Sequence, residues 1–252
     1  MDQCRICLAT SSRISKELGA CLNCIRQRPE DALPMAMRAH KKSRAAFRLP
    51  HEPPKDSHGI PCKICVNECQ IPEGGLGYCG LRENDGGKLT GVSPEEGKLS
   101  WYNDPLPTNC VGDWVCPGGT GAGFPEYAHS SGPEYGYKNL AVFFHACTFN
   151  CLFCQTWHFR EETLRPRTAP VRGLVSDVDE RTSCICYFGG DPTSQLPFAL
   201  KASRKAVEVR KGKILRICWE TNGSMHAGML EEMIELSMNS GGCIKFDLKA
   251  WD

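Results

Sequence analysis

The sequence has no apolar run long enough to cross a membrane, and its first residues, MDQCRICLATSSR, lack the apolar stretch of a signal peptide. We therefore expect a cytoplasmic protein without a membrane partner. The 30 basic and 29 acidic residues leave a net charge of +1, so the composition does not favour nucleic acid as a partner. The sequence also lacks the Ser-His-Asp order and the paired carboxylates of common hydrolases.

Cysteine is the abundant exception, with 17 residues in a chain of 252. A secreted protein would pair most of them as disulfides, but an odd number in a reducing compartment favours metal binding by thiolates. The spacing supports this interpretation, because most of the cysteines fall in C-x2-C or C-x3-C groups. We therefore expect several metal sites.

The second half of the chain alternates short apolar runs with helix-length segments. The runs at 139–146, 183–190, 214–220 and 243–249 are predicted strands, and the segments 198–212 and 228–239 are predicted helices. This order is typical of βαβ units around a parallel sheet, so the fold class is α/β. The preceding residues 91–136 are rich in glycine and proline, and we expect them to be an irregular connector.

Unusual residues follow each predicted strand. Parallel sheets place their chemistry at the carboxyl ends of the strands, so these residues are expected to form one site. The three cysteines after the first strand can hold three irons of a cubane and leave the fourth iron open. Buried core cysteines, or a zinc site with a distant ligand, are the alternatives. The residues at the four strand ends are Cys147, Cys151 and Cys154; Gly189, Gly190, Asp191 and Pro192; Glu220, Thr221 and Asn222; and Asp247 and Lys249.

The C-x3-C-x2-C motif after a first strand, with the aromatic Phe153 before its last cysteine, resembles the signature of the radical S-adenosylmethionine (SAM) superfamily. Gly-Gly-Asp-Pro (189–192) is similar to that superfamily's Gly-Gly-Glu-Pro segment, which meets the amino group of the SAM methionine. The resemblance implies the same role here, with Asp191 offering a carboxylate of shorter reach than glutamate.

Two later motifs resemble the pyruvate formate-lyase-activating-enzyme branch, namely Glu-Thr-Asn-Gly (220–223) and Asp-Leu-Lys (247–249). The resemblance implies that Lys249 binds the methionine carboxylate and that Glu220, Thr221 and Asp247 help to hold a monovalent cation. It also implies a partial (β/α) barrel over 137–252. With four predicted strands, this core is expected to be C-terminally incomplete.

The activity implied by this resemblance is reductive cleavage of SAM by a 4Fe–4S cluster, giving a 5′-deoxyadenosyl radical that abstracts hydrogen from an unidentified substrate. A glycyl-radical protein, another macromolecule and a small molecule are all candidate substrates, and the expected reductant partner is a flavodoxin or ferredoxin. Two other classes stay open. One is an electron-transfer iron–sulfur protein, and the other is a zinc-dependent binding module with a degenerate barrel.

Two further cysteine groups precede this core. The pairs Cys4–Cys7 and Cys21–Cys24 have the C-x2-C spacing of a zinc ribbon, so residues 1–27 are predicted to be a zinc-ribbon-like module. Iron–sulfur or rubredoxin-like iron binding, and free thiols, are the alternatives. Residues 28–58 are predicted to be a basic helix, beginning near Pro34, and a linker.

The second group, in residues 59–90, resembles a leader found before the radical core in relatives of the activating enzymes. Zinc and an auxiliary 4Fe–4S cluster both suit ligation by thiolates alone. The cysteines inside predicted strands are expected to be small buried apolar residues rather than ligands. The second group consists of Cys62, Cys65, Cys69 and Cys79, and the strand cysteines are Cys184, Cys186, Cys218 and Cys243.

Overall fold

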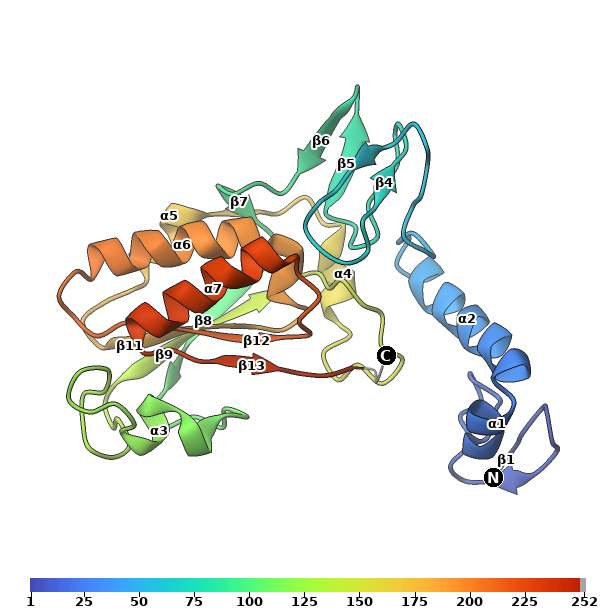
Figure 1. Cartoon of the computed structure of the whole chain (residues 1–252), viewed down its shortest axis with the longest axis horizontal. Coiled ribbons are helices and arrows are strands. Elements are labelled where there is room, and N and C mark those ends of the chain that lie inside the picture. The colour runs from blue at the N-terminus through green and yellow to red at the C-terminus, as the bar shows by residue number, and fades with distance from the viewer. Residues whose placement is uncertain (250–252) are drawn as a thin grey trace. The chain divides into compact units, whose positions relative to one another are not determined.

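The computed structural model describes residues 1–249 and divides into two compact units (Figure 1). The first unit joins Met1–Glu52 to the short segment Asn150–Cys154, and the second joins Pro53–Phe149 to Gln155–Asp252. Residues 250–252, the end of the predicted core, lie outside the described residues. Each unit is considered by itself below.

The first unit consists of two short strands and two helices. Strands β1 (Asp2–Gln3) and β2 (Thr10–Ser11) pair antiparallel and are followed by α1 (Leu22–Gln27) and α2 (Pro29–Ala45). The prediction that the basic helix begins near Pro34 is wrong, because α2 begins at Pro29. A proline at the first helical position loses no hydrogen bond, and the acidic Glu30 and Asp31 that follow it interact favourably with the helix dipole.

The second unit is built on a five-stranded sheet with the order β13-β12-β11-β9-β8. Strands β9, β11, β12 and β13 are parallel, which confirms the arrangement predicted from the sequence. Helices connect them, as expected of βαβ units. The bounds are β8 (Leu99–Pro105), β9 (Lys138–Phe144), β11 (Thr182–Phe188), α6 (Leu196–Val209), β12 (Arg216–Thr221), α7 (Ala227–Ser240) and β13 (Ile244–Phe246).

Strand β8 corrects the prediction that residues 91–136 are irregular. It pairs antiparallel with β9 along its whole length, from Leu99 opposite Phe144 to Pro105 opposite Lys138. The alternating Leu99 and Trp101 were a weak strand signal among many glycines and prolines. In the described part of the chain the sheet is open at β8 and β13, so the predicted partial barrel is seen there only as an open sheet.

One face of the sheet packs against α5 (Val171–Ser176), α6 and α7 and forms the main core (Figure 1). Its two largest aromatic residues are Tyr187 and Trp219, whose rings stack with centroids 4.6 Å apart. Each finds a polar partner on a helix: Ser203 Oγ donates to the Tyr187 hydroxyl at 3.0 Å, and Trp219 Nε1 donates to Ser237 Oγ at 3.0 Å. These contacts fix both helices to the sheet while satisfying buried polar atoms.

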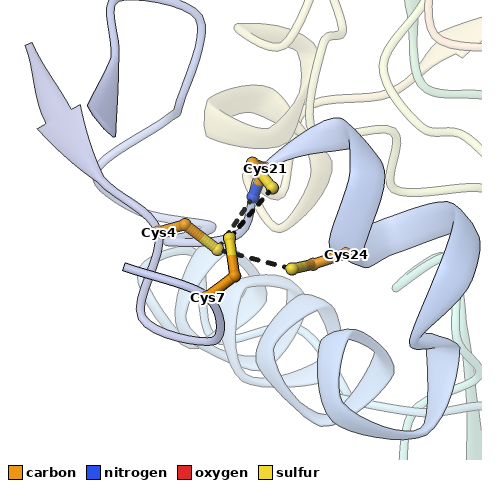
Figure 2. A group of neighbouring side chains, drawn as sticks. All are labelled: Cys4, Cys7, Cys21 and Cys24. Atoms are coloured by element: carbon orange, nitrogen blue, oxygen red, sulfur yellow. Dashed lines mark hydrogen bonds between the residues drawn. The ribbon is translucent and has the colours of Figure 1, made fainter. Parts of the chain in front are cut away.

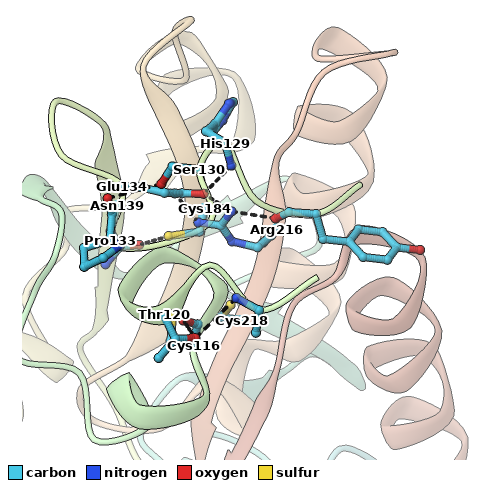
Figure 3. Close-up of polar contacts among 12 residues, drawn as sticks. Cys116, Thr120, His129, Ser130, Pro133, Glu134, Asn139, Cys184, Arg216 and Cys218 are labelled. Atoms are coloured by element: carbon cyan, nitrogen blue, oxygen red, sulfur yellow. Dashed lines mark hydrogen bonds and ion pairs between the residues drawn. The ribbon is translucent and has the colours of Figure 1, made fainter. Parts of the chain in front are cut away.

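Residues 106–137 cover the opposite face and include η1 (Asp113–Val115) and α3 (Pro117–Thr120) (Figure 1). Their attachment is a fully buried ion pair between Glu134 and Arg216 at the start of β12 (Figure 3). The two guanidinium nitrogens Nη1 and Nη2 donate to the two carboxylate oxygens at 2.8 and 2.7 Å. Nη1 also donates to the carbonyl of Tyr127 at 2.7 Å. The pair is therefore bidentate and holds two points of the covering segment.

The remaining elements are short. They include three two-stranded sheets, which pair β3 with β4, β5 with β6 and β7 with β10. None of the described helices combines the length and apolar character needed to cross a membrane. The bounds are β3 (Ile60–Pro61), β4 (Gln70–Ile71), β5 (Arg82–Asp85), β6 (Lys88–Gly91), β7 (Glu96–Gly97), α4 (Phe159–Thr163), β10 (Ala169–Pro170) and η2 (Pro192–Gln195).

Replacing Glu134 by glutamine should lower the free energy of unfolding by about 3–5 kcal/mol, because it leaves the Arg216 guanidinium charged and buried without its partner. Urea denaturation of the two proteins measures this difference. The matched control is Glu232→Gln, which breaks the exposed pair with Arg204 and should change the free energy by less than about 1 kcal/mol. Equal effects of the two substitutions would contradict the assignment.

The same pair predicts a pH dependence. Burial disfavours the charge of Glu134, but the Arg216 guanidinium outweighs burial and holds the pKa of that carboxyl below its usual range. A carboxyl whose pKa is lowered by folding stabilises the protein above its unfolded pKa, and this contribution is lost as the pH falls through the folded value. The gap between wild type and Glu134→Gln should therefore narrow below pH 4.5.

Candidate functional site

The carboxyl ends of the parallel strands are joined by one buried carboxylate, that of Asp191. Its Oδ1 accepts from the backbone N–H of Thr193 at 2.8 Å, and its Oδ2 accepts from the backbone N–H of Asn222 at 2.7 Å. The Thr221 hydroxyl donates to Oδ2 at 3.2 Å. Burial raises the pKa of Asp191, while these donors oppose the shift. Asp191 thus connects the start of η2 to the end of β12.

The neighbouring glycines let two strand ends approach each other. Gly189 and Gly190 have φ values of +63° and +53°, in the left-handed region that favours glycine. A Cβ atom on Gly190 would lie 2.3 Å from the carbonyl oxygen of Ala146 and 2.4 Å from that of Phe144. The Asp191 N–H donates to the same Ala146 oxygen at 2.8 Å. The Gly-Gly-Asp-Pro segment, with Pro192 buried at the start of η2, is therefore packed against the residue that precedes Cys147.

Cys147 follows β9 and its sulfur accepts hydrogen bonds. The backbone N–H of Phe149 donates to Sγ at 3.3 Å, and the side-chain amide of Asn222 lies 3.7 Å from it. The same Asn222 nitrogen donates to Thr148 Oγ1 at 2.9 Å. Donors directed at a sulfur stabilise a thiolate, and hydrogen bonds to ligand sulfurs also tune iron–sulfur clusters. This environment fits a metal-ligating cysteine.

Cys151 and Cys154 belong to the first unit, whereas Cys147 belongs to the second. Within the first unit the Cys154 N–H donates to the Cys151 carbonyl at 3.2 Å, so the C-x2-C pair forms a tight turn. Phe153 in that turn is 71% exposed. All three cysteines are partly exposed and none of them forms a disulfide, which suits thiols that act as metal ligands.

The other strand-end residues fall into two ion pairs. Glu220 Oε1 lies 3.0 Å from Lys245 Nζ, so a lysine ammonium stands beside this predicted cation ligand. Asp247 pairs with Lys249 after β13, and its backbone N–H donates to the Thr221 carbonyl at 2.8 Å. The structure thus places Thr221 and Asp247 next to each other through the backbone, while Glu220 points to a different partner.

A cavity of about 140 Å³ lies on the sheet face opposite the main core and was not predicted from the sequence. Lys245 Nζ donates to Cys110 Sγ at 3.0 Å and to Cys186 Sγ at 3.4 Å. Burial lowers the pKa of Lys245, but the surrounding thiols and Glu220 outweigh it and raise the pKa overall. Cys184, Cys186 and Cys218 are buried as expected, yet they line this cavity instead of the main core, and Cys243 is only partly buried.

Two features of the sequence could have predicted polar or cysteine side chains on this face of the sheet. Cys184 and Cys186 alternate along β11, and Lys245 interrupts the otherwise apolar CIKF run. Alternation of this kind indicates that a strand is buried on both faces, with different neighbours on each. The cavity itself required Cys110, which comes from the covering segment and is distant in sequence.

The N-terminal cysteines form a compact group within the first unit (Figure 2). The sulfurs of Cys4 and Cys24 are 3.8 Å apart, and those of Cys7 and Cys21 are 3.7 Å apart. A single tetrahedral ion with metal–sulfur bonds of about 2.3 Å requires sulfurs roughly 3.8 Å apart. Backbone N–H groups around Cys4, foremost that of Cys7, lower the pKa of its thiol to about 6. The group can therefore bind a metal ion.

Comparison with known proteins gives one family. The model of the radical SAM superfamily matches residues 141–252, from within β9 to the last residue of the chain. The matched segment includes the three cysteines and every strand-end motif described above. Residues 141–252 thus carry a radical SAM domain, which implies an iron–sulfur cluster and SAM. No curated protein and no solved structure matches the chain.

Replacing Gly190 by alanine should destabilise the protein by about 3 kcal/mol or more, because the new methyl group would overlap two backbone carbonyls. The matched control is Gly212→Ala. Gly212 also has a positive φ, of +77°, but apart from its chain neighbours no atom of the described residues lies within 4 Å of the position that its new methyl group would take. Only about 1 kcal/mol of backbone strain is therefore expected there. Urea denaturation measures both. Similar losses would show that strain alone, and not the close approach, explains Gly190.

Proposed function

We propose that this protein is a radical SAM enzyme whose Cys147, Cys151 and Cys154 ligate a 4Fe–4S cluster. When bound, the cluster and SAM supply a 5′-deoxyadenosyl radical that abstracts hydrogen from a substrate. The observation that carries the proposal is the junction at the strand ends. There, Asn222 contacts both the Cys147 side chain and the Asp191 carboxylate, so three motifs of the matched domain meet.

The chain's own residues have separate tasks in this proposal. Asn222 and the Phe149 N–H orient the Cys147 sulfur. Gly189 and Gly190 bring the backbone close to the cluster loop, and Lys249 binds the methionine carboxylate as a point charge. Asp191 acts mainly as a positioning residue, since both of its oxygens already accept hydrogen bonds from the chain.

The cavity beside Glu220 and Lys245 supplies space for the reacting part of the substrate. Phe188, the residue directly before Gly189, lines one part of this cavity, and the other lining residues lie along the sheet face that residues 106–137 cover. The strand-end motifs resemble the pyruvate formate-lyase-activating-enzyme branch, which favours a protein as substrate. A flavodoxin or ferredoxin supplies the electron. None of the 17 cysteines forms a disulfide, which suits a reducing cytoplasm.

The N-terminal group holds a structural zinc ion in this proposal. Its four sulfurs have the spacing of one tetrahedral ion, and four thiolates leave no open ligand position. The apolar clusters around Cys4 and Ala20 contain few residues and stabilise this module only weakly. Metal binding therefore contributes part of the free energy of its folding.

Cleavage of SAM tests the proposed activity. Protein reconstituted with iron and sulfide under anaerobic conditions, then reduced with dithionite, should release 5′-deoxyadenosine and methionine from SAM. Replacing all three of Cys147, Cys151 and Cys154 by alanine should abolish this product. The matched control is Cys243→Ala, which removes a partly buried cysteine outside the three groups and should leave cleavage intact. Product is measured by liquid chromatography with mass detection.

The outcomes separate the function classes. Iron at the triad without 5′-deoxyadenosine would favour electron transfer, and no iron at the triad would favour a binding module with a degenerate barrel. Either result would sink the proposed activity.

Lys249 gives a prediction about affinity. Removing a charged donor to a carboxylate costs about 1.5–3 kcal/mol, so Lys249→Met should raise the Kd for SAM roughly 10- to 150-fold. The iron content of the Lys249→Met protein should equal that of the wild type. The control is Lys213→Met, which changes an exposed lysine after α6. Its Kd for SAM should equal that of the wild type. Anaerobic calorimetry measures both, and an unchanged Kd for Lys249→Met would remove this residue from the SAM site.

A further inference from the structure

The second cysteine group surrounds a small cavity in the second unit. Cys62, Cys65, Cys69 and Cys79 all line this space of about 10 Å³. The backbone folds around it, since the Cys62 N–H donates to the Cys69 carbonyl at 2.8 Å. The Tyr78 N–H also points to Cys69 Sγ at 3.5 Å. Four cysteines that are close in sequence therefore line one cavity without forming a disulfide.

This cavity lies against the strand ends of the radical SAM domain. The Val66 N–H donates to the Ser224 carbonyl at 2.9 Å, and the Asn67 side-chain amide donates to the Thr148 carbonyl at 2.7 Å. On another side, Arg82 Nη1 donates to the Ser194 carbonyl at 3.0 Å. Thr148 itself lines the cavity and is the residue directly after Cys147.

The spacing of the sulfurs differs from that in the N-terminal group. The sulfurs of Cys4, Cys7, Cys21 and Cys24 all lie within 4.8 Å of one another, as a single ion requires. Across residues 1–249 this is the one group of three or more cysteine, histidine or acidic side chains that meets that limit. No three sulfurs of the second group meet that limit, so they are more widely spaced than those of the N-terminal group.

Wide spacing of four thiolate sulfurs is the arrangement that a cubane requires. Each thiolate of a 4Fe–4S cluster binds a different iron, so its sulfurs stand farther apart than four ligands of one ion. Four thiolates would bring negative charge into a site whose cysteines are buried or partly buried. The buried Arg82 beside them supplies a compensating positive charge.

We propose that Cys62, Cys65, Cys69 and Cys79 ligate a second 4Fe–4S cluster, with all four irons bound by protein, set against Thr148 in the loop after β9. Of the two metals that the sequence allowed at this group, the geometry points to iron–sulfur instead of zinc. This site does not depend on SAM cleavage at Cys147, Cys151 and Cys154, so the two proposals can fail separately.

The test uses the full chain with Cys147, Cys151 and Cys154 replaced by alanine, so that the second group remains intact. After anaerobic reconstitution this variant should hold about four irons and about four sulfides per chain. Reduction should give the electron paramagnetic resonance signal of a reduced cubane. The same variant should also hold about one zinc ion at the N-terminal group.

Two pairs of further substitutions in this background assign the metals. Adding Cys62→Ser and Cys79→Ser should remove the cubane signal and leave the zinc, whereas adding Cys4→Ser and Cys24→Ser should remove the zinc and leave the cubane. Circular dichroism checks that α6 and α7 are retained in each. A triad-free protein that binds two zinc ions and no iron would overturn the proposal, as would a single iron with a rubredoxin-like spectrum. Failure of the protein with an intact triad to cleave SAM, when the triad-free protein still holds the cubane, would count only against the radical activity.

Discussion

The buried ion pair between Glu134 and Arg216 determines how the second unit is covered. Arg216 stands at the first position of β12, on the face that the helices leave open, and without a partner its charge would be strongly unfavourable there. Glu134 supplies that partner from residues 106–137 (Figure 3). The covering segment then brings Cys110 to Lys245 and closes one side of the cavity. The buried charge of Arg216 thus requires Glu134, and the same ion pair holds residues 106–137, which have little regular structure, against the sheet.

A second carboxylate organises the opposite ends of the strands. Asp191 is also buried, but its partners are N–H and hydroxyl groups instead of a cation, so it ties backbone segments together. The glycines before it allow the approach, and Asn222 extends the network to Cys147. Asp191 and Glu134 stabilise the fold in the same way. Each buried carboxylate accepts hydrogen bonds from separate segments of the chain, and the free-energy cost of leaving it without donors keeps those segments together.

The cysteines divide into groups with different surroundings. The N-terminal sulfurs are packed at the spacing of one ion, the second group surrounds a cavity, and the strand cysteines lie on the covered face of the sheet beside Lys245. The same side chain is thus a candidate zinc ligand, a candidate iron ligand and a lining residue in one chain. Spacing in the sequence brings sulfurs near each other, whereas the packing around them decides how far apart they lie.

The sequence by itself determined that β9, β11, β12 and β13 are parallel strands joined by helices, because strand and helix periodicities are local properties of the chain. It also predicted the N-terminal cysteine group, whose four sulfurs the structure brings together, and its strand-end motifs lie within the family match at 141–252. Only the tertiary structure decided that Leu99–Pro105 extends the sheet, that Glu134 meets Arg216, and that Glu220 faces Lys245. Those contacts join residues far apart in the chain, and burial, which no local pattern encodes, selects the partner.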